Sequence, residues 1–250
     1  MSDLVTKFSY RDLHARSRSI IIFGEAEHGV RPYTLEIQRA LEEFRLLGFS
    51  CFAVEMLPSG YNDRLKQYTV TGRMSDDLVK YLGLWTHRGD QTPRNYRELI
   101  AMARRVGMSV IGLDIHVDEW RDLPQETSHL KRNIHMAAEL AKVVKGGDKV
   151  VALMHRFHAE TTSDLGAGVK RLLKENHQLE ATFIKLVGGT SCIYPHECKN
   201  PYRIPAELRA IASSAAGKRF YIEGAGTLDK ADFILHLPQT LIPLEEVARP

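Results

Sequence analysis

The sequence lacks the features that mark membrane proteins and secreted proteins. Three cysteines in 250 residues are too few, and odd in number, for a disulfide framework. Residues 1–19 contain no apolar stretch of the signal-peptide type. Nowhere does the chain reach the roughly 20 consecutive apolar residues that a membrane helix needs. We therefore expect a cytoplasmic protein in a reducing compartment, with no membrane span.

An excess of charge of one sign is also missing. The chain has 34 basic and 31 acidic residues, and this formal net charge of +3 is too small to indicate nucleic acid as a partner. Apolar residues at helical spacing flank basic pairs such as Arg104-Arg105 and Lys170-Arg171, which is typical of solvated helix faces. The 44% hydrophobic and 26% charged residues are ordinary for a folded globular protein.

Short apolar runs alternate with segments of helical periodicity, and this alternation predicts the fold class. Strands are predicted over residues 19–23, 51–56, 109–114, 149–154 and 181–187, with late strands over 219–222 and 232–237. Helices are predicted over residues 32–47, 61–71, 76–84, 95–106, 128–144 and 168–175. Strands separated by helices form parallel βαβ units.

We therefore expect an α/β fold in which helices flank a central, mostly parallel sheet. No internal repeat or low-complexity linker divides the chain, so residues 1–250 are predicted to form a single domain. Residues 1–17 are predicted to be an N-terminal extension. Residues 188–205, rich in Gly, Pro and Asn, are predicted to be an irregular excursion.

The carboxyl ends of the first four predicted strands carry acid and base side chains. These are Glu25 and His28 after the first strand, Glu55 in the second, Asp114 and His116 at the third, and His155, Arg156 and His158 after the fourth. In an open parallel sheet, ligands bind outside the carboxyl ends of the strands. Each residue alone also has a structural explanation, such as a salt bridge for Glu55 or a plain loop position for His28. Their coincidence at one sheet edge predicts a single active site.

The predicted set suits the activation of water. A histidine can take a proton from water, and a nearby buried carboxylate fixes its tautomer and raises its basicity. A second histidine or Arg156 would stabilise a developing oxyanion. We assign catalytic roles to four residues, substrate binding to four others, and no metal ligand. The catalytic residues are His28, Glu25, Glu55 and His155; the substrate-binding residues are His158, Arg156, Asp114 and His116.

Two other chemistries compete with this interpretation. A covalent acyl-enzyme is disfavoured, because no serine lies in a G-x-S-x-G motif and no cysteine follows a strand in the predicted site. A divalent metal centre is the main alternative, although the compact H-E-x-x-H signature is absent. Its ligands would be Glu25, His28, Glu55 and His155 or His158. The motif CIYPHEC, residues 192–198, is a weaker zinc candidate without an evident fourth ligand.

Several of these elements, taken in order, resemble a known family. Residues 23–56 resemble the opening of the erythromycin esterase and ChaN-like superfamily: a strand, G-E-x-x-H-G, a helix, Gly-Phe, and a second strand ending in Glu. RNIHMA, residues 132–137, is similar to the family's R-x-x-x-M-A helix. KVVALMHRFHA, residues 149–159, is similar to its strand followed by H-x-x-H. The resemblance covers residues 19–190, and the order of four elements makes it moderately specific.

The branches of this superfamily imply different functions. The esterase branch implies a hydrolase without a cofactor, in which His28 activates water, Glu25 and Glu55 support it, and His155 assists at the carbonyl or leaving group. Peptidase-like relatives imply a divalent metal in the same cleft. The ChaN branch implies haem binding, and the candidate iron ligands would be Tyr33, Tyr61 and Tyr96. Toxin and effector domains, and a pseudoenzyme without turnover, are further possibilities.

Of these, we expect a hydrolase that cleaves an ester, lactone or amide bond in a small-molecule or peptide substrate. In place of the esterase branch's A-H-N-x-H, this chain has Met154-His155-Arg156-Phe157-His158. The Asn is therefore absent, and the chain is also shorter than those esterases. These departures weaken the case for a macrolide lactone as the substrate.

Overall fold

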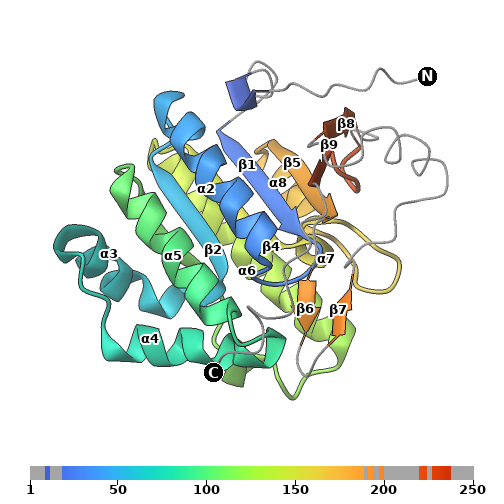
Figure 1. Ribbon diagram of the computed structural model, residues 1–250. Helices are drawn as coiled ribbons and strands as arrows, with labels where there is room; N and C mark the ends of the chain where they lie inside the picture. Colours follow the sequence, from blue (N-terminus) through green and yellow to red (C-terminus); the bar gives the residue numbers. More distant parts are fainter. Residues whose placement is uncertain are drawn as a thin grey trace.

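The computed structural model describes residues 9–11, 19–188, 191–193, 197–199, 220–223 and 227–237. Its centre is a seven-stranded sheet with the strand order β3-β2-β4-β1-β5-β9-β8 (Figure 1). The strands are β1 (Ile20–Glu25), β2 (Cys51–Pro58), β3 (Ser109–Asp114), β4 (Val150–His155), β5 (Ala181–Gly188), β8 (Phe220–Glu223) and β9 (Phe233–Leu237). All neighbouring pairs are parallel except the last, in which β8 runs antiparallel to β9.

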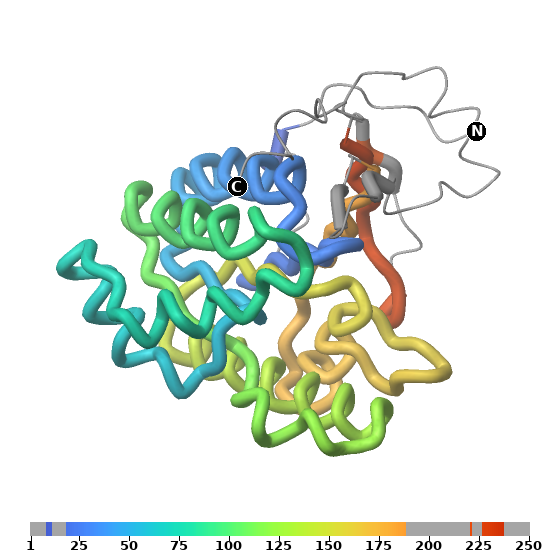
Figure 2. The backbone as a smooth tube through the Cα atoms, turned by 60° about the horizontal axis from the view of Figure 1, so that its bottom comes forward, coloured from blue at the N-terminus to red at the C-terminus, as the bar shows by residue number. Residues whose placement is uncertain are grey.

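Helices cover both faces of this sheet, which confirms the α/β prediction. The helices are α2 (Arg31–Leu46), α3 (Asn62–Thr71), α4 (Asp76–Gly83), α5 (Thr92–Arg105), α6 (Gln125–Lys145), α7 (Arg156–Ala159) and α8 (Val169–His177), with 3-10 turns η1 (Ser59–Tyr61), η2 (Leu84–Arg88) and η3 (Val117–Glu119). In Figure 2, blue α2 and green α5 lie on one side of the sheet and yellow-green α6 lies on the other. No helix in the described ranges is long and apolar enough to span a membrane.

The two faces of the sheet have separate cores. In β1, Ile21 and Phe23 belong to the cluster under α2 and α5, whereas Ile20 and Ile22 belong to the cluster under α6 and α8. All four side chains are fully buried. Because both faces are covered, the strand is a continuous apolar run rather than an alternating one. This is why the strands could be located from sequence.

The observed helix starts differ most from the prediction. Helix α6 begins at Gln125, and α5 begins at Thr92, each three residues earlier than predicted. The first turn of α6 is exposed and polar, and the buried face of the helix begins only at Ser128. Strand β2 runs on to Pro58, which places Glu55 inside the strand.

The predicted extension and excursion are described only in part. Tyr10, within the extension, is fully buried and donates its hydroxyl hydrogen bond to Glu36 at 2.6 Å. Within the excursion, β6 (Ser191–Ile193) and β7 (Glu197–Lys199) form an antiparallel pair. His196 of the zinc candidate lies outside the described residues, as do the side chains of the other two candidate ligands.

One of the basic pairs predicted to lie on solvated helix faces does not do so throughout. Arg105 is exposed, whereas Lys170 is buried and donates from Nζ to Asp232 Oδ1 at 2.9 Å.

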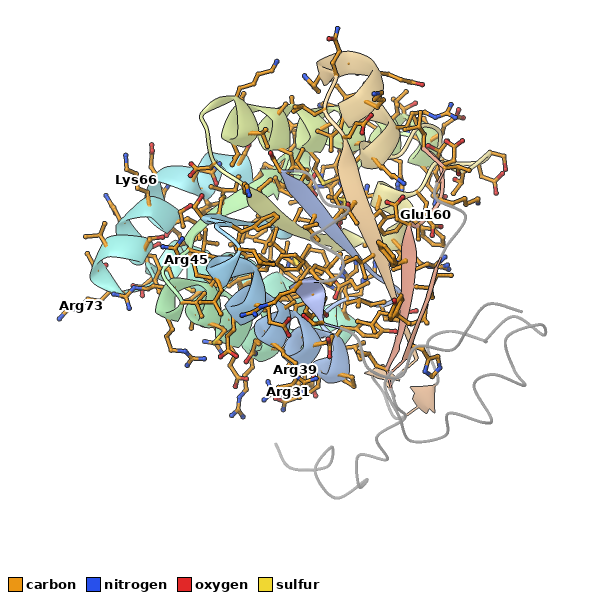
Figure 3. All side chains as sticks on the ribbon, turned by 90° about the horizontal axis from the view of Figure 1, so that it is seen from above. Arg31, Arg39, Arg45, Lys66, Arg73 and Glu160 are labelled. Atoms are coloured by element: carbon orange, nitrogen blue, oxygen red, sulfur yellow. The ribbon has the colours of Figure 1, made fainter. Side chains whose placement is uncertain are left out.

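Basic side chains on α2 are solvated and paired. Figure 3 labels Arg31 and Arg39, which project from the outer face of α2. Arg31 forms an ion pair with Glu98 of α5, and Arg39 pairs with Glu36 at 3.2 Å. The Arg39 side chain is 59% exposed, so this pair contributes at most about 1 kcal/mol to stability.

Candidate active site

The turn after β1 holds Glu25 and His28 in direct contact. Glu25 Oε1 lies 2.9 Å from His28 Nδ1 and accepts the Tyr96 hydroxyl at 2.7 Å. The other carboxylate oxygen, Oε2, accepts the backbone N–H of Gly29 at 3.0 Å. Within the described ranges, nothing hydrogen-bonds to His28 Nε2. The carboxylate therefore orients the ring with Nδ1–H inward and the Nε2 lone pair available.

Two glycines make this turn possible. A Cβ at Gly24 would lie 2.5 Å from the Phe183 ring, so glycine leaves the room at the end of β1 that this ring occupies. Gly29 has φ +65°, a left-handed conformation that points its N–H back at Glu25. Its carbonyl accepts a hydrogen bond from Asn95 Nδ2 at 2.8 Å, which ties the turn to α5.

The His28 ring lies between two aromatic neighbours. Its centroid is 4.7 Å from the Trp85 ring and 4.9 Å from the His155 ring. Trp85 is anchored by its indole N–H, which donates to the Met56 carbonyl at 3.1 Å. The His28 side chain is 9% exposed, so it is held on both sides but still reaches solvent.

Neither ring nitrogen of His155 is available to act as a base. Its Nε2 lies 3.1 Å from the Ala26 carbonyl, and its Nδ1 accepts the Phe157 backbone N–H at 3.3 Å. Burial, together with the charge of the neighbouring His28, lowers the pKa of His155 to about 3. The ring is therefore neutral, with both nitrogens engaged by the backbone.

A second, fully buried cluster joins β2, β3 and α6. Glu55 Oε1 accepts Arg132 Nη2 at 2.8 Å, and Glu55 Oε2 accepts the His155 backbone N–H at 2.5 Å. The same guanidinium binds Asp114 through Nε at 3.0 Å and Nη2 at 2.7 Å. One arginine thus bridges the carboxyl ends of β2 and β3, and Glu55 links this cluster to the strand that carries His155.

The charges within this cluster shift the pKa of each carboxyl group differently. Burial by itself would raise the pKa of Glu55, but His158, His28 and Arg132 hold it well below its usual value. Burial raises the pKa of Asp114 despite the adjacent Arg132. Two carboxylates and one guanidinium leave one excess negative charge, which a cationic His158 would balance.

The contacts of His158 suit that cationic form. Its Nδ1 lies 2.6 Å from Asn133 Oδ1, and its Nε2 lies 3.3 Å from Glu55 Oε1. The Asn133 amide is oriented because its Nδ2 donates to the Ala167 carbonyl at 2.9 Å. Both ring nitrogens therefore face oxygen acceptors. The ring also stacks on His129, with centroids 4.5 Å apart.

The structure brings most, but not all, of the predicted site residues together. The residues that lie in the two linked clusters are Glu25, His28, Glu55, Asp114, His155 and His158. Arg156 lies instead with its guanidinium carbon 4.5 Å from the Phe157 ring centroid. His116 is 41% exposed, pairs with Asp118 at 3.2 Å, and lines a pocket beyond the end of β3.

Sequence reasoning did not assign Trp85, Asn133 and Arg132 to the site, and it named Tyr96 only as a candidate ligand of haem iron. Arg132 carried a usable signal, because it shares a helix face with Met136 and Leu140, which are buried. A cation on a buried face needs acidic partners. Tyr96 is buried on α5, and nothing local in the sequence connects it to Glu25.

The side chains of the two clusters, as they stand, do not fit a metal ion, and two of the three candidate tyrosines do not fit haem iron. The carboxylate oxygens of Glu25 and Glu55 already accept N–H and O–H donors. Across the described residues, no three His, Cys, Asp or Glu side chains gather as a metal site would require. The Tyr33 and Tyr96 hydroxyls donate to internal acceptors, and burial raises both pKa values, which disfavours the phenolate that would ligate iron.

Sequence comparison finds no matching family model and no matching curated protein. Solved structures do match the fold. A mutant erythromycin esterase in its open conformation is 12% identical over 93% of this chain and 95% of that chain, with a TM-score of 0.59. The haem-bound ChaN of Campylobacter jejuni is 14% identical over 92% of both chains, with a TM-score of 0.50.

A structure described as bacterial protein toxins is also similar, at 19% identity and a TM-score of 0.52 over 69% of this chain. The match covers only 35% of that toxin chain, so this protein spans about a third of its length. These identities are all low, and the likeness therefore concerns the fold. The chain has the α/β fold that an erythromycin esterase and ChaN share, in agreement with the family resemblance of its motifs.

Proposed function

We propose that the protein is a hydrolase that cleaves an ester, lactone or amide bond, with His28 as the general base. The observation that carries this proposal is the contact between Glu25 and His28, which leaves the Nε2 lone pair available to water. The fold shared with an erythromycin esterase supports the hydrolytic class. A positioned general base typically contributes a rate factor of about 10²–10⁴.

In the proposed reaction, water attacks the substrate carbonyl carbon while His28 Nε2 takes one of its protons. Glu25 stabilises the imidazolium that forms, because its Oε1 already accepts the Nδ1–H. The tetrahedral intermediate collapses when the imidazolium returns the proton to the leaving oxygen or nitrogen. The products are a carboxylic acid and an alcohol or amine, and the base is restored.

The buried Glu55 cluster supports this base indirectly. Glu55 accepts the His155 backbone N–H, so it fixes the residue whose ring lies against His28. Arg132 and Asp114 hold Glu55 in place.

The test is hydrolysis of a panel of chromogenic esters, lactones and amides, with and without a chelator. We expect turnover that the chelator leaves unchanged and that Glu25→Gln lowers by a factor of about 10². Loss of turnover on chelation would contradict His28 as the activator of water and would favour the metal-dependent peptidase chemistry.

A further inference from the structure

A serine and a histidine form a hydrogen-bonded pair inside the pocket that His116 lines. Ser59 Oγ lies 2.8 Å from His135 Nε2. Ser59 opens η1 directly after β2, whereas His135 lies on α6, so the fold brings them together from 76 positions apart. The cavity has a volume of about 350 Å³, within the range of about 300–1,000 Å³ typical of ligand pockets.

The lining of this pocket suits a small ester. Pro58, Tyr61 and Ile115 give it an apolar wall, where an acyl chain would lie. The lining also includes the charged residues Arg64, Asp77 and Glu119, which suit a hydroxylated alcohol part. The pocket therefore offers apolar contacts for the acyl part of an ester and polar contacts for its alcohol part, beside the Ser59 hydroxyl.

The pair is separate from the His28 site. His28 is held by Glu25, Tyr96, Trp85 and His155, and none of these lines the pocket. Arg132 precedes His135 by nearly one turn of α6, and its guanidinium is engaged by Glu55 and Asp114. None of the hydrogen bonds of the charged cluster involves Ser59 or His135.

We propose that Ser59 and His135 form a second, nucleophilic centre that takes up the acyl group of small carboxylic esters. Ser59 Oγ attacks the carbonyl carbon as its proton passes to His135 Nε2, and the departing alcohol then takes that proton. Water hydrolyses the resulting acyl-serine: His135 accepts one water proton and returns it to Ser59 Oγ. The net reaction consumes one ester and one water and yields one acid and one alcohol.

The sequence disfavoured an acyl-enzyme because no serine lies in a G-x-S-x-G motif. Ser59 does follow a strand, four positions after Glu55, but in a plain P-S-G context that carries no signature. His135 lies on a helix whose apolar periodicity drew attention to its other face. Only the fold makes the pair visible.

The test is labelling of the full chain with a fluorophosphonate probe, which phosphonylates an activated serine and releases fluoride. We expect one adduct per chain, located on Ser59 by peptide mass mapping. Labelling should be lost in Ser59→Ala and slowed at least tenfold in His135→Gln. It should keep its rate in His28→Ala, which separates this proposal from the function proposed above.

Matched controls are Ser50→Ala, whose hydroxyl is bonded to the Asp148 carboxylate, and His177→Gln at the far end of α8. Both should label like the wild type, and circular dichroism checks the fold of each variant. A p-nitrophenyl acetate burst of one equivalent, present in His28→Ala and absent in Ser59→Ala, would support acylation. No adduct on Ser59, or labelling of Ser59 at the same rate in His135→Gln, would overturn the proposal.

Discussion

His28 Nδ1 lies 2.9 Å from Glu25 Oε1, and that same oxygen accepts the Tyr96 hydroxyl at 2.7 Å. This convergence has a chemical consequence. A histidine whose Nδ1–H is committed to a carboxylate presents Nε2 as its basic nitrogen. The arrangement depends on Gly29, whose N–H occupies the other carboxylate oxygen. Four residues from β1, its turn and α5 therefore define one base.

Tyr96→Phe tests the part that the phenol plays in orienting this base. The change removes a donor to Glu25 while it keeps the ring that packs against Trp85. We expect a loss of about 1 kcal/mol in the free energy of unfolding, typical of one buried hydrogen bond. Turnover should fall several-fold through kcat, because the Glu25–His28 contact loses a constraint. An unchanged kcat would show that Tyr96 does not orient the base.

Gly29→Ala tests the turn itself. A Cβ there would lie 2.4 Å from Thr92 Cγ2, in a backbone conformation with φ +65°. We expect more than about 1 kcal/mol of destabilisation, together with loss of turnover. Gly48→Ala is the matched control, since Gly48 has φ +85° but nothing within 4 Å of an added Cβ. Its cost should be smaller and its turnover normal; equal effects in both variants would contradict this account.

Arg132→Met tests the buried cluster. The change leaves Glu55 and Asp114 facing each other without their shared cation, so we expect urea unfolding to show a loss of about 3–5 kcal/mol. Arg39→Met is the control, because the Arg39 side chain is 59% exposed and its loss should cost under about 1 kcal/mol. Similar losses in the two variants would mean that the cluster is solvated rather than buried.

The low pKa of His155 predicts how stability depends on pH. Burial lowers that pKa to about 3, whereas a histidine in an unfolded chain has a pKa of about 6.5. Between these values the unfolded chain binds more protons than the folded one, so the free energy of unfolding falls as the pH drops from about 6.5 toward 3. Glu55 acts in the same direction, because its folded pKa is also lowered.

The measurement is urea unfolding of the wild type and of His155→Asn at neutral pH and near pH 5. The stability difference between the two pH values should be smaller in His155→Asn, because one titrating group is gone. His87→Gln, at an exposed position on η2, should keep the wild-type difference. The opposite ranking of these two variants would contradict a buried, neutral His155.

The strands and their order of appearance were predictable because burial on both faces leaves apolar runs such as residues 20–23. The gathering of Glu25, Glu55 and His158 was predictable too, since parallel strands present their carboxyl ends at one edge. The α6 start was not, because its first turn is exposed and polar. The hydrogen-bond partners of these residues were not predictable either. Arg132 lies 77 positions from Glu55 in the sequence, and only the packing of α6 brings the two side chains together.

The sequence also could not separate a catalytic histidine from a structural one. His28 and His155 both follow strands, and either ring would suit a general base. The two rings differ in their hydrogen bonds. Both ring nitrogens of His155 contact the backbone, at Ala26 and Phe157, whereas His28 uses one ring nitrogen, Nδ1, to contact the Glu25 carboxylate. Such contacts depend on turn geometry that motif spacing does not encode.

The most direct test of the central claim is kcat/KM of His28→Ala beside that of His177→Gln, with chelator present, on the best ester of the panel whose hydrolysis Ser59→Ala leaves unchanged. His177 lies at the end of α8, far from the turn after β1. We predict that His28→Ala loses a factor of about 10²–10⁴ while His177→Gln stays at the wild-type value. Wild-type kcat/KM in a folded His28→Ala would contradict the assignment of His28 as the base.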